Sequence, residues 1–303
     1  MYAVFNITEK LKNAKILIEN MLEGKIISEI EDYVYSGPKT IQEISKKIGK
    51  SWITADRYVS RIESEIGTIS TRTFRGGTRG ALKIAFWASA EKARKSVFQE
   101  KLEKEIFFYK KKEDFSPFDI FQHVPEGRKD VSLEKSAKEL LLDAGETCEF
   151  VRSAKRQILI FSGNLSIINL KDREQELYSE LAKSAKRGVK IKVICRVDLQ
   201  GIKNVKKALS INYASGVEAV EIRHREQPLR AIICDDSSFR IKEMKEPTGK
   251  QNEFSEKISI FYKIKDKPWA EWLSHIFWKM FSESFDAEKR IVELEKIALL
   301  EKD

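Results

Sequence analysis

The spacing of apolar positions predicts several helices at the start of the chain. Leu, Ile, Met and Val recur at helical spacing across residues 8–36, and Gly24 divides this stretch into two predicted helices, the second ending at a Gly-Pro pair at 37–38. Thr40 and Glu43 have the three-residue separation of a capping box. The next helix is therefore expected to begin at Thr40.

A longer helix is expected over residues 51–66, because an apolar residue recurs every three or four positions from Ala55 to Ile66. Its other positions carry polar, cationic and aromatic side chains, as in a helix anchored on one side that reads DNA with the other. The candidate contact residues on this helix are Ser51, Trp52, Thr54, Arg57, Tyr58 and Arg61. The alternative is a surface helix whose arginines are only solvated.

A β-hairpin is expected next, because two β-prone runs at residues 68–74 and 81–87 flank a glycine-rich turn. No acidic residue occurs between Glu65 and Glu91, and glycines at a turn allow the backbone to approach phosphates closely. The candidate contact residues of the hairpin are Arg72, Arg75, Gly76, Gly77, Arg79 and Lys83. The alternative is a basic hairpin that binds another anion, such as an RNA backbone.

Helix, turn, helix and basic hairpin, in this order, are typical of a winged helix-turn-helix, a module that binds double-stranded DNA. The charge distribution agrees with such a partner. The net charge is +9, and residues 1–112 hold 22 Lys and Arg against 14 Asp and Glu, whereas the rest of the chain holds 34 against 33. The excess of positive charge therefore lies in the part that contains the predicted module, where a polyanion is expected to bind.

The middle of the chain is predicted to connect two domains. A charged helix is expected over residues 89–113, with an apolar row from Phe98 to Tyr109 that packs either on a second subunit or on the chain's own C-terminal domain. Residues 114–131 contain two prolines and three phenylalanines, and we interpret them as an interdomain linker that docks on a surface. The segment 89–131 is thus a candidate for dimerisation, between domains at 1–88 and 132–303.

The second half of the chain alternates between helical and β-prone segments, a pattern typical of an α/β layered domain. The expected helices are 133–155, 173–187, 202–213 and a long C-terminal helix over 267–301. The expected strands are 157–164, 189–196, 217–223, 230–235, 239–244 and 257–264. The whole chain is therefore predicted to be a two-domain protein of α+β and α/β class.

Three segments of this domain resemble the phospholipase-D-like fold. They read SAKELLLDAGETCEFVRSAKRQILIFSGN, ELYSELAKSAKRGVKIKVICR and GVEAVEIR followed by PLRAIICDD. A domain of this kind behind a winged helix occurs in the TrmB-like family of archaeal transcriptional regulators, and the order of elements over residues 25–285 is similar to that family. The resemblance implies a DNA-binding regulator with a degenerate phospholipase-D-like C-terminal domain.

The catalytic motif of the phospholipase D superfamily, H-x-K-x4-D, is incomplete in this sequence. If Asp235 is taken as the motif aspartate, Arg230 stands at the lysine position and Pro228 at the histidine position. Proline offers no nucleophile, so the resemblance implies a domain that has kept the scaffold without the reaction. We expect no catalytic residue, and the three histidines of the chain are expected to be structural or on the surface.

Polar residues at the ends of the predicted strands are expected to line a crevice. These candidates for binding a small polar or anionic effector, such as a polyol, are Ser162, Asn164, Arg196, Asp198, Arg223, Arg230 and Asp235. The alternative is that these groups only satisfy one another. No metal and no cofactor is expected, because the sequence lacks a P-loop, a GxGxxG and an HExxH motif.

Three functions remain open from the sequence. The first is a sequence-specific transcriptional regulator that acts as a homodimer on double-stranded DNA, with a C-terminal domain that dimerises or senses an effector. The second is a phospholipase-D-class nuclease, and the third is a non-specific, chromatin-type DNA-binding protein. Three cysteines without metal-ligand spacing, and no apolar run near the roughly 18 residues of a membrane span, lead us to expect a cytoplasmic protein without membrane contact.

Overall fold

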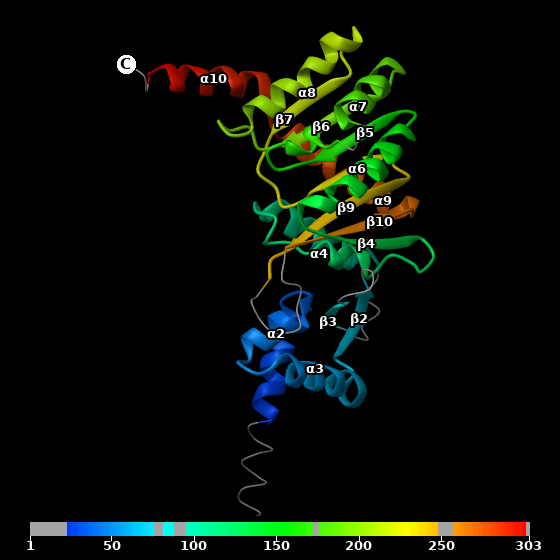
Figure 1. Ribbon diagram of the computed structural model, residues 1–303, viewed down its shortest axis with the longest axis vertical. Helices are drawn as coiled ribbons and strands as arrows, with labels where there is room; N and C mark the ends of the chain where they lie inside the picture. The colour runs from blue at the N-terminus through cyan, green and yellow to red at the C-terminus, as the bar shows by residue number, and fades with distance from the viewer. Residues whose placement is uncertain (1–22, 76–80, 88–94, 172–175, 248–256, 301–303) are drawn as a thin grey trace, which may run out of the picture. The chain divides into compact units, whose positions relative to one another are not determined.

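The computed structural model describes residues 23–75, 81–87, 95–171, 176–247 and 257–300. The chain divides into two compact units (Figure 1). Unit 1 consists of Met1–Lys92 and Pro247–Ser255, and unit 2 consists of Ala93–Glu246 and Glu256–Asp303. Of the helices that the structure describes, none combines the length and the apolar character that crossing a bilayer requires.

Unit 1 contains short helices and a small antiparallel sheet. The described helical segments are residues 23–35, α2 (Ile41–Lys47), α3 (Trp52–Arg61) and a π-helical turn, η1 (Ile62–Ile66), that continues α3. The sheet has the order β1-β3-β2, with β1 at Lys39–Thr40, β2 at Ile69–Arg75 and β3 at Ala81–Trp87. The helices predicted after Gly24, from Thr40 and from Ser51 are present, as are both strands of the hairpin. The helix predicted before Gly24 and the turn at residues 76–80 lie outside the described residues.

The start of α2 is fixed by the capping box that the sequence predicts. The Thr40 hydroxyl accepts a hydrogen bond from the Glu43 backbone N–H at 3.1 Å, and the Thr40 N–H donates to Glu43 Oε2 at 2.7 Å. The preceding helix is described from residue 23 to residue 35, with Gly24 at the start of this described segment. One glycine weakens a helix by only about 1 kcal/mol relative to alanine, and here the buried Ile30 and Val34 anchor the segment.

The core of unit 1 joins all of its helices to the sheet. Its buried members come from the first helix, α2, α3, η1 and both hairpin strands: Ile30, Val34, Ile41, Ile44, Ala55, Val59, Ile62, Ile69 and Ala85. Because α3 contributes only the side that carries Ala55 and Val59, its opposite side faces away from this core.

Unit 2 is built on an eight-stranded mixed sheet with the order β11-β7-β6-β5-β8-β9-β10-β4. Its strands are β4 (Lys129–Lys135), β5 (Gln157–Phe161), β6 (Lys190–Cys195), β7 (Val220–His224), β8 (Ala231–Cys234), β9 (Ser238–Lys245), β10 (Ile258–Ile264) and β11 (Phe285–Asp286). Strands β5, β6 and β7 are parallel, and the remaining neighbours pair antiparallel. The α/β domain is therefore confirmed as a large mixed sheet.

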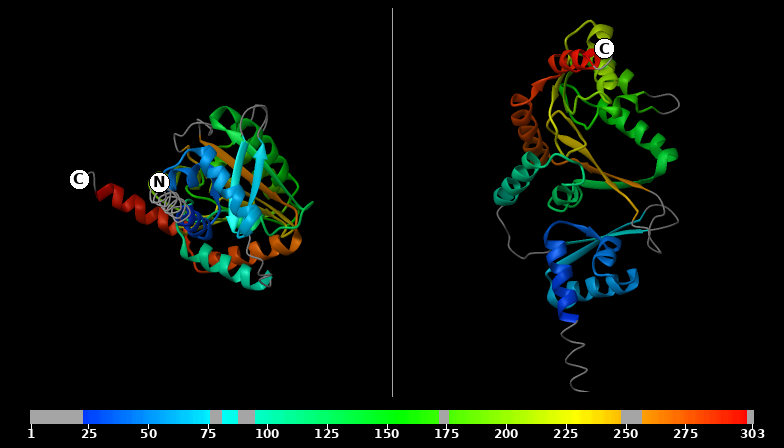
Figure 2. Two further views of the ribbon diagram at one scale, coloured as in Figure 1. Left: turned by 90° about the horizontal axis from the view of Figure 1, so that it is seen from below. Right: turned by 90° about the vertical axis from the view of Figure 1, so that its left-hand side faces the viewer.

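Helices cover both faces of this sheet (Figure 2). One face carries α6 (Ser136–Arg152), η2 (Ser166–Asn169), α7 (Leu177–Lys186), α8 (Ile202–Ser215) and α10 (Ala287–Leu300). The other carries α5 (Phe118–Phe121) and α9 (Lys267–Ser282), and α4 (Lys95–Phe108) contacts α9 through the ion pair of Lys279 with Glu103.

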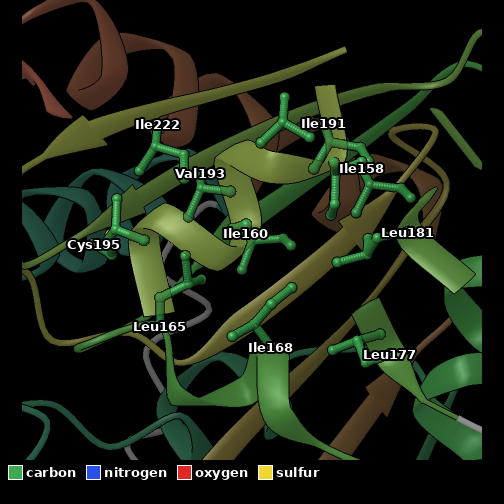
Figure 3. Close-up of a cluster of buried hydrophobic side chains, with 14 of the residues drawn as sticks. Ile158, Ile160, Leu165, Ile168, Leu177, Leu181, Ile191, Val193, Cys195 and Ile222 are labelled. Atoms are coloured by element: carbon green, nitrogen blue, oxygen red, sulfur yellow. The ribbon is translucent and has the colours of Figure 1, made fainter. Parts of the chain in front are cut away.

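Alternate residues of the parallel strands form the core beneath α7 and η2. Figure 3 shows this cluster, in which the strand residues lie opposite Leu165, Ile168, Leu177 and Leu181. The strand members drawn there are Ile158, Ile160, Ile191, Val193, Cys195 and Ile222. Their two-residue spacing is that of one face of a sheet, since successive side chains of a strand point to opposite sides.

The segment predicted as a linker belongs to unit 2. Phe115, Phe118 and Phe121 are buried, and Phe121 packs on Tyr262 of β10 at 4.9 Å between ring centroids. The helix predicted from residue 133 begins only at 136, because residues 129–135 form β4 and pair with β10 along its length. The segment Asp130-Val131-Ser132-Leu133-Glu134 alternates between polar and apolar residues, and this short strand signal was missed because the prediction extended the following helix over it.

One further boundary differs from the sequence prediction, and one alternative left open by the sequence is resolved. The C-terminal helix is interrupted at β11, where Asp286 Oδ1 accepts the backbone N–H groups of Glu288 and Lys289 and so caps a new helix, α10. The apolar row of α4 packs within the chain itself, because Leu102 and Ile106 are buried inside unit 2. Of the two alternatives for this row, the structure shows packing on the chain's own domain.

Candidate functional sites

Helix α3 of unit 1 has one anchored side and one exposed side. Ala55 and Val59 are fully buried, whereas Arg57 is exposed and the Ile53 side chain is 66% exposed. Ile53 and Arg57 are four residues apart, so they lie one above the other on the same face of the helix. This face offers a long cationic donor next to an apolar group.

The other predicted residues at the start of α3 have structural partners. Ser51 is the N-cap, and its hydroxyl accepts the Thr54 backbone N–H at 3.2 Å and lies 2.8 Å from the Thr54 hydroxyl. Trp52 and Tyr58 are half-buried and pack against the unit 1 core. These four side chains therefore begin and anchor the helix, which leaves them less surface for a ligand.

Arg61 and Lys83 are held in ion pairs. Arg61 Nε donates to Glu65 at 2.8 Å and the guanidinium also pairs with Glu23, and the hydrogen bond to Glu65 is the main reason that the pKa of Arg61 is raised. Lys83 Nζ donates to Asp56 at 2.6 Å. Among the described residues, no carboxylate lies within ion-pair distance of Arg57. Arg57 is thus the cation of α3 that is available without breaking a pair.

The hairpin residues are only partly described. Arg72 lies half-buried on β2, with its guanidinium 5.8 Å from the Phe74 ring centroid, and Arg75 is the last residue of that strand. The predicted contacts Gly76, Gly77 and Arg79 lie outside the described residues. Three lysines that the sequence prediction omitted are exposed at the end of α2 and in the turn before α3: Lys46, Lys47 and Lys50. Their close spacing, K-K-x-x-K, was the available signal.

In unit 2, the loops after β5 and β6 meet at one edge of the sheet. The Arg196 backbone N–H donates to the Gly163 carbonyl at 2.6 Å, and Ser162 N–H donates to the Ile194 carbonyl at 2.9 Å. Because these strands are parallel, their carboxyl ends lie side by side. The structure thus brings Ser162, Asn164 and Arg196 together, as predicted from their positions after the strands.

Arg230 reaches the same place from the start of β8. Its guanidinium lies so close to Gly163 that a Cβ on that residue would meet Nη2 at 2.6 Å. Its Nη1 donates to the carbonyls of Leu229 at 2.7 Å and Gln227 at 3.3 Å. Burial, followed by the nearby charge of Arg196, lowers the pKa of Arg230. No carboxylate among the described residues lies within 4.0 Å of this guanidinium.

These residues border a cavity of about 850 Å³ in unit 2. Its walls come from the segment after α4, the loops at the sheet edge, η2 and strands β8, β9 and β10. Its cationic lining residues are Lys110, Lys111, Lys112, Lys171, Arg196, Arg225, Arg230, Arg240 and Lys242, against the two carboxylates Glu113 and Glu226. Its apolar lining includes Phe161, Ile167, Leu170, Ile232, Met244 and Phe261. The K-K-K run at 110–112, which the sequence prediction omitted, was a further signal for this site.

The prediction that placed Asp235 at this edge is wrong. Strand β8 runs antiparallel to β5, with Cys234 opposite Ile158 and Ala231 opposite Phe161, so β8 ends at the other edge of the sheet. There Asp235 accepts the backbone N–H groups of Lys155, Arg156 and Gln157 at 2.7–3.0 Å. The sequence shows that a strand ends at Asp235 and leaves the direction of that strand open.

Two more predicted effector residues do not line the cavity. Arg223 donates to its neighbour Glu221 at 2.6 Å and stacks over Phe281. Asp198 accepts from Arg196 Nε at 2.6 Å and from the Gly201 N–H at 2.7 Å, so it holds Arg196 in place. Of the seven predicted effector residues, four therefore line the cavity and Asp198 positions one of them, Arg196. The four are Ser162, Asn164, Arg196 and Arg230.

Three candidate nucleophiles near the sheet are His224, Cys195 and Cys234. His224 Nδ1 accepts the Val197 backbone N–H at 2.9 Å, and burial lowers the pKa of this imidazole. Burial raises the pKa of the Cys195 thiol to about 12 and that of Cys234 further still. Within the part of the chain that the structure describes, no group of three or more His, Cys, Asp and Glu is placed to hold a metal ion.

Comparison with known proteins gives matches among solved structures. No family model and no curated protein matches the sequence. TrmBL2, an archaeal chromatin protein whose structure shows a novel mode of DNA binding, matches with a TM-score of 0.37 and 17% identity over 86% of this chain and 92% of that one.

Two phospholipase D structures are also similar to part of the chain. They are Nuc from Salmonella typhimurium, a phospholipase D family member, and NucT from Helicobacter pylori. Each matches with a TM-score of 0.36 and 16% identity, covering 52% of this chain and 97% and 99% of the other. The matched structures are thus of the two kinds that the sequence resembles, a TrmB-like protein and phospholipase D family members.

Proposed function

We propose that unit 1 is a winged helix-turn-helix that binds duplex DNA through α3, and that the chain is a homodimeric, sequence-specific transcriptional regulator. The observation that carries this proposal is the division of α3 into a buried side and an exposed side with Arg57 and Ile53. A guanidinium can donate two hydrogen bonds to a guanine edge, and an apolar side chain can contact a thymine methyl group. The basic hairpin that follows would act as the wing.

The resemblance of unit 2 to phospholipases is, in our proposal, one of scaffold alone. Pro228 occupies the motif histidine position, and Arg230, at the motif lysine position, is fixed to the carbonyls of Leu229 and Gln227. A nucleophile for phosphoryl transfer would have to be found elsewhere, yet His224 accepts a backbone hydrogen bond and the nearby thiols resist ionisation. Unit 2 would then serve dimerisation or effector sensing.

Replacing Arg57 tests the recognition face. Arg57→Ala should weaken binding to a preferred duplex by a factor of about 5–150, because a good side-chain contact to a base edge contributes about 1–3 kcal/mol. Arg61→Ala is the matched control on the same helix, and it should change binding less than about threefold because Glu65 and Glu23 already neutralise this residue. Fluorescence anisotropy with a labelled duplex measures both effects.

The opposite ranking of these two variants would contradict the assignment of the exposed face. The same reaction mixtures, incubated without metal, should leave the duplex intact, whereas cleavage would favour the nuclease hypothesis. If the unaltered chain, Arg57→Ala and Arg61→Ala all bound every duplex equally, α3 would not be the helix that recognises DNA.

The wing is tested by salt dependence. Arg75 and Arg79 are proposed, from their positions in the sequence, to contact phosphates or the minor groove. Each phosphate contact adds about 0.9 to the slope of log affinity against log salt concentration, because bound counterions are released. Arg75→Ala with Arg79→Ala should therefore reduce the slope by about two and weaken specific and non-specific binding alike. An unchanged slope would rule out the wing.

A further inference from the structure

The cavity of unit 2 has an excess of positive charge that its own carboxylates do not cancel. Several of its cations have partners nearby, since Arg196 pairs with Asp198, Arg225 with Glu283 at 3.1 Å, and Arg240 with Glu146 at 3.1 Å. Arg230 has no such partner among the described residues, and Lys110 and Lys111 are exposed at the border of the cavity. The region around Arg230 is therefore where an additional negative charge would be stabilised most.

Arg230 is held in an orientation suited to an anion. Two backbone carbonyls take part of its hydrogen-bonding capacity, and the lack of a side chain on Gly163 allows the guanidinium to approach the loop after β5 closely. A desolvated cation beside Arg196 is costly unless an anion compensates it. A bound acidic group would receive charge-assisted hydrogen bonds from a guanidinium that loses little freedom on binding.

The floor of the cavity lies on strands β8, β9 and β10 and combines apolar with cationic side chains. The register places Ile232 opposite Arg240, and Lys242 opposite Phe261, so these four side chains lie on one face of the sheet. The Phe261 ring has Lys242 4.8 Å from its centroid and Arg240 at 5.7 Å. Together with Met244, this ring offers a surface for an apolar or aromatic body rather than for a small ion alone.

We propose that this cavity binds a phosphate monoester that carries an aromatic or apolar body, with the phosphate at Arg230 and Arg196 and the body against Phe261 and Met244. A phosphate monoester carries close to two negative charges at neutral pH, which suits a site with several cations. A cavity of about 850 Å³ is within the range of small-molecule sites and exceeds what inorganic phosphate fills. The inference rests on the proposed effector role of unit 2 and is independent of the DNA contacts of unit 1.

Isothermal titration calorimetry of the full chain with three probes tests this inference. Phenyl phosphate should bind at least tenfold more tightly than inorganic phosphate, and benzyl alcohol, which lacks the charge, should not bind measurably. Arg230→Gln should weaken phenyl phosphate and inorganic phosphate at least tenfold. Phe261→Leu should remove most of the advantage of phenyl phosphate and leave inorganic phosphate unchanged. Lys203→Gln, an exposed cation on α8 outside the cavity, is the matched control and should bind as the unaltered chain does.

Thermal unfolding of each variant shows whether it is folded. If Arg230→Gln fails to fold, replacing the exposed Lys110 and Lys111 by glutamine should still weaken phenyl phosphate at least threefold at low salt. Absence of binding by both phosphates, equal affinity for both, or undiminished binding by the variants would each overturn the inference. A chain that binds duplex DNA but no probe overturns this inference alone, whereas one that binds the probe but no duplex overturns only the function proposed for unit 1.

Discussion

Asp235 shows how a single side chain can order two segments of unit 2. It follows β8 in a left-handed conformation, with φ at 52°, and its carboxylate receives three consecutive backbone N–H groups from the segment that enters β5. Burial by itself would raise the pKa of Asp235, but the hydrogen bonds from Gln157, Lys155 and Arg156 outweigh it, so the pKa lies below the ordinary 3.8. The residue that sequence comparison assigns to a catalytic motif is therefore a structural cap here.

Asp235→Asn should destabilise unit 2 by about 1–3 kcal/mol, because an amide cannot accept all three N–H groups and loses the charge. Asparagine tolerates the left-handed conformation, so backbone strain is not the cause. Since the folded pKa is lowered, the stability from the carboxylate is present above pH 3.8 and is lost as the pH falls through the folded pKa. Urea unfolding should show the difference between the two proteins shrinking below pH 4.

Asp236→Asn is the control for this prediction. Among the residues that the structure describes, the Gln157 side chain is the one hydrogen-bond donor to its carboxylate, which lies 3.7 Å from Arg156, so its loss should matter less. A larger effect of Asp236→Asn than of Asp235→Asn would contradict the capping role of Asp235.

At the scale of elements, helix α4 has a row of apolar residues that the sequence assigned either to a second subunit or to the chain's own C-terminal domain. Leu102 and Ile106 are buried in unit 2, and Lys279 of α9 lies 4.8 Å from the Phe107 ring centroid. On the same helix the Phe108 side chain is 80% exposed. The helix is thus integral to its own domain, and its exposed side remains the part that a partner subunit could use.

Leu102→Ala should lower the free energy of unfolding of unit 2 by about 2–5 kcal/mol, the range for removing a buried leucine side chain. Phe108→Ala, on the exposed side of α4, should change it by less than about 0.5 kcal/mol. Denaturant unfolding followed by tryptophan fluorescence measures both effects, because three of the chain's five tryptophans, Trp269, Trp272 and Trp278, lie in α9. If both substitutions had the same small effect, α4 would not be part of the unit 2 core.

At the scale of the whole molecule, regulator and chromatin-type function differ in site selectivity. A homodimer presents two copies of α3, and symmetric partners read half-sites about one helical turn of DNA apart. We expect selection of bound duplexes from a random pool to enrich a palindromic or directly repeated motif of this spacing. Arg57→Ala should reduce the enrichment at the bases that this side chain contacts. Binding without any enriched motif would instead support the chromatin-type alternative.

The dimer itself is tested independently by light scattering coupled to size-exclusion chromatography. A particle of twice 35.1 kDa is expected for the homodimer. If the chain were a monomer that still selected a single half-site, the assignment of α3 as the recognition helix would stand and the proposed homodimer would be wrong.

The sequence alone determined the local features. Periodicity and turn residues are properties of neighbouring positions, and they predicted most helices and strands of unit 2. They also predicted the capping box at Thr40, the buried stripe of α3 and the hairpin strands. The predicted positions of Ser162, Asn164 and Arg196 near one another also followed, because parallel strands end at the same edge.

Tertiary structure decided what depends on residues far apart in the chain. The antiparallel direction of β8 moved Asp235 to the opposite edge, and strand β4 exists because β10 supplies its hydrogen bonds. Arg61 is paired with Glu65 and Lys83 with Asp56, whereas Arg57 has no ion pair among the described residues. These pairings became visible only in the tertiary structure. Phe261, Arg230 and the lysines after α4 meet in one cavity only after folding. Periodicity cannot encode such choices, since each is set by the position of a partner brought close by the fold.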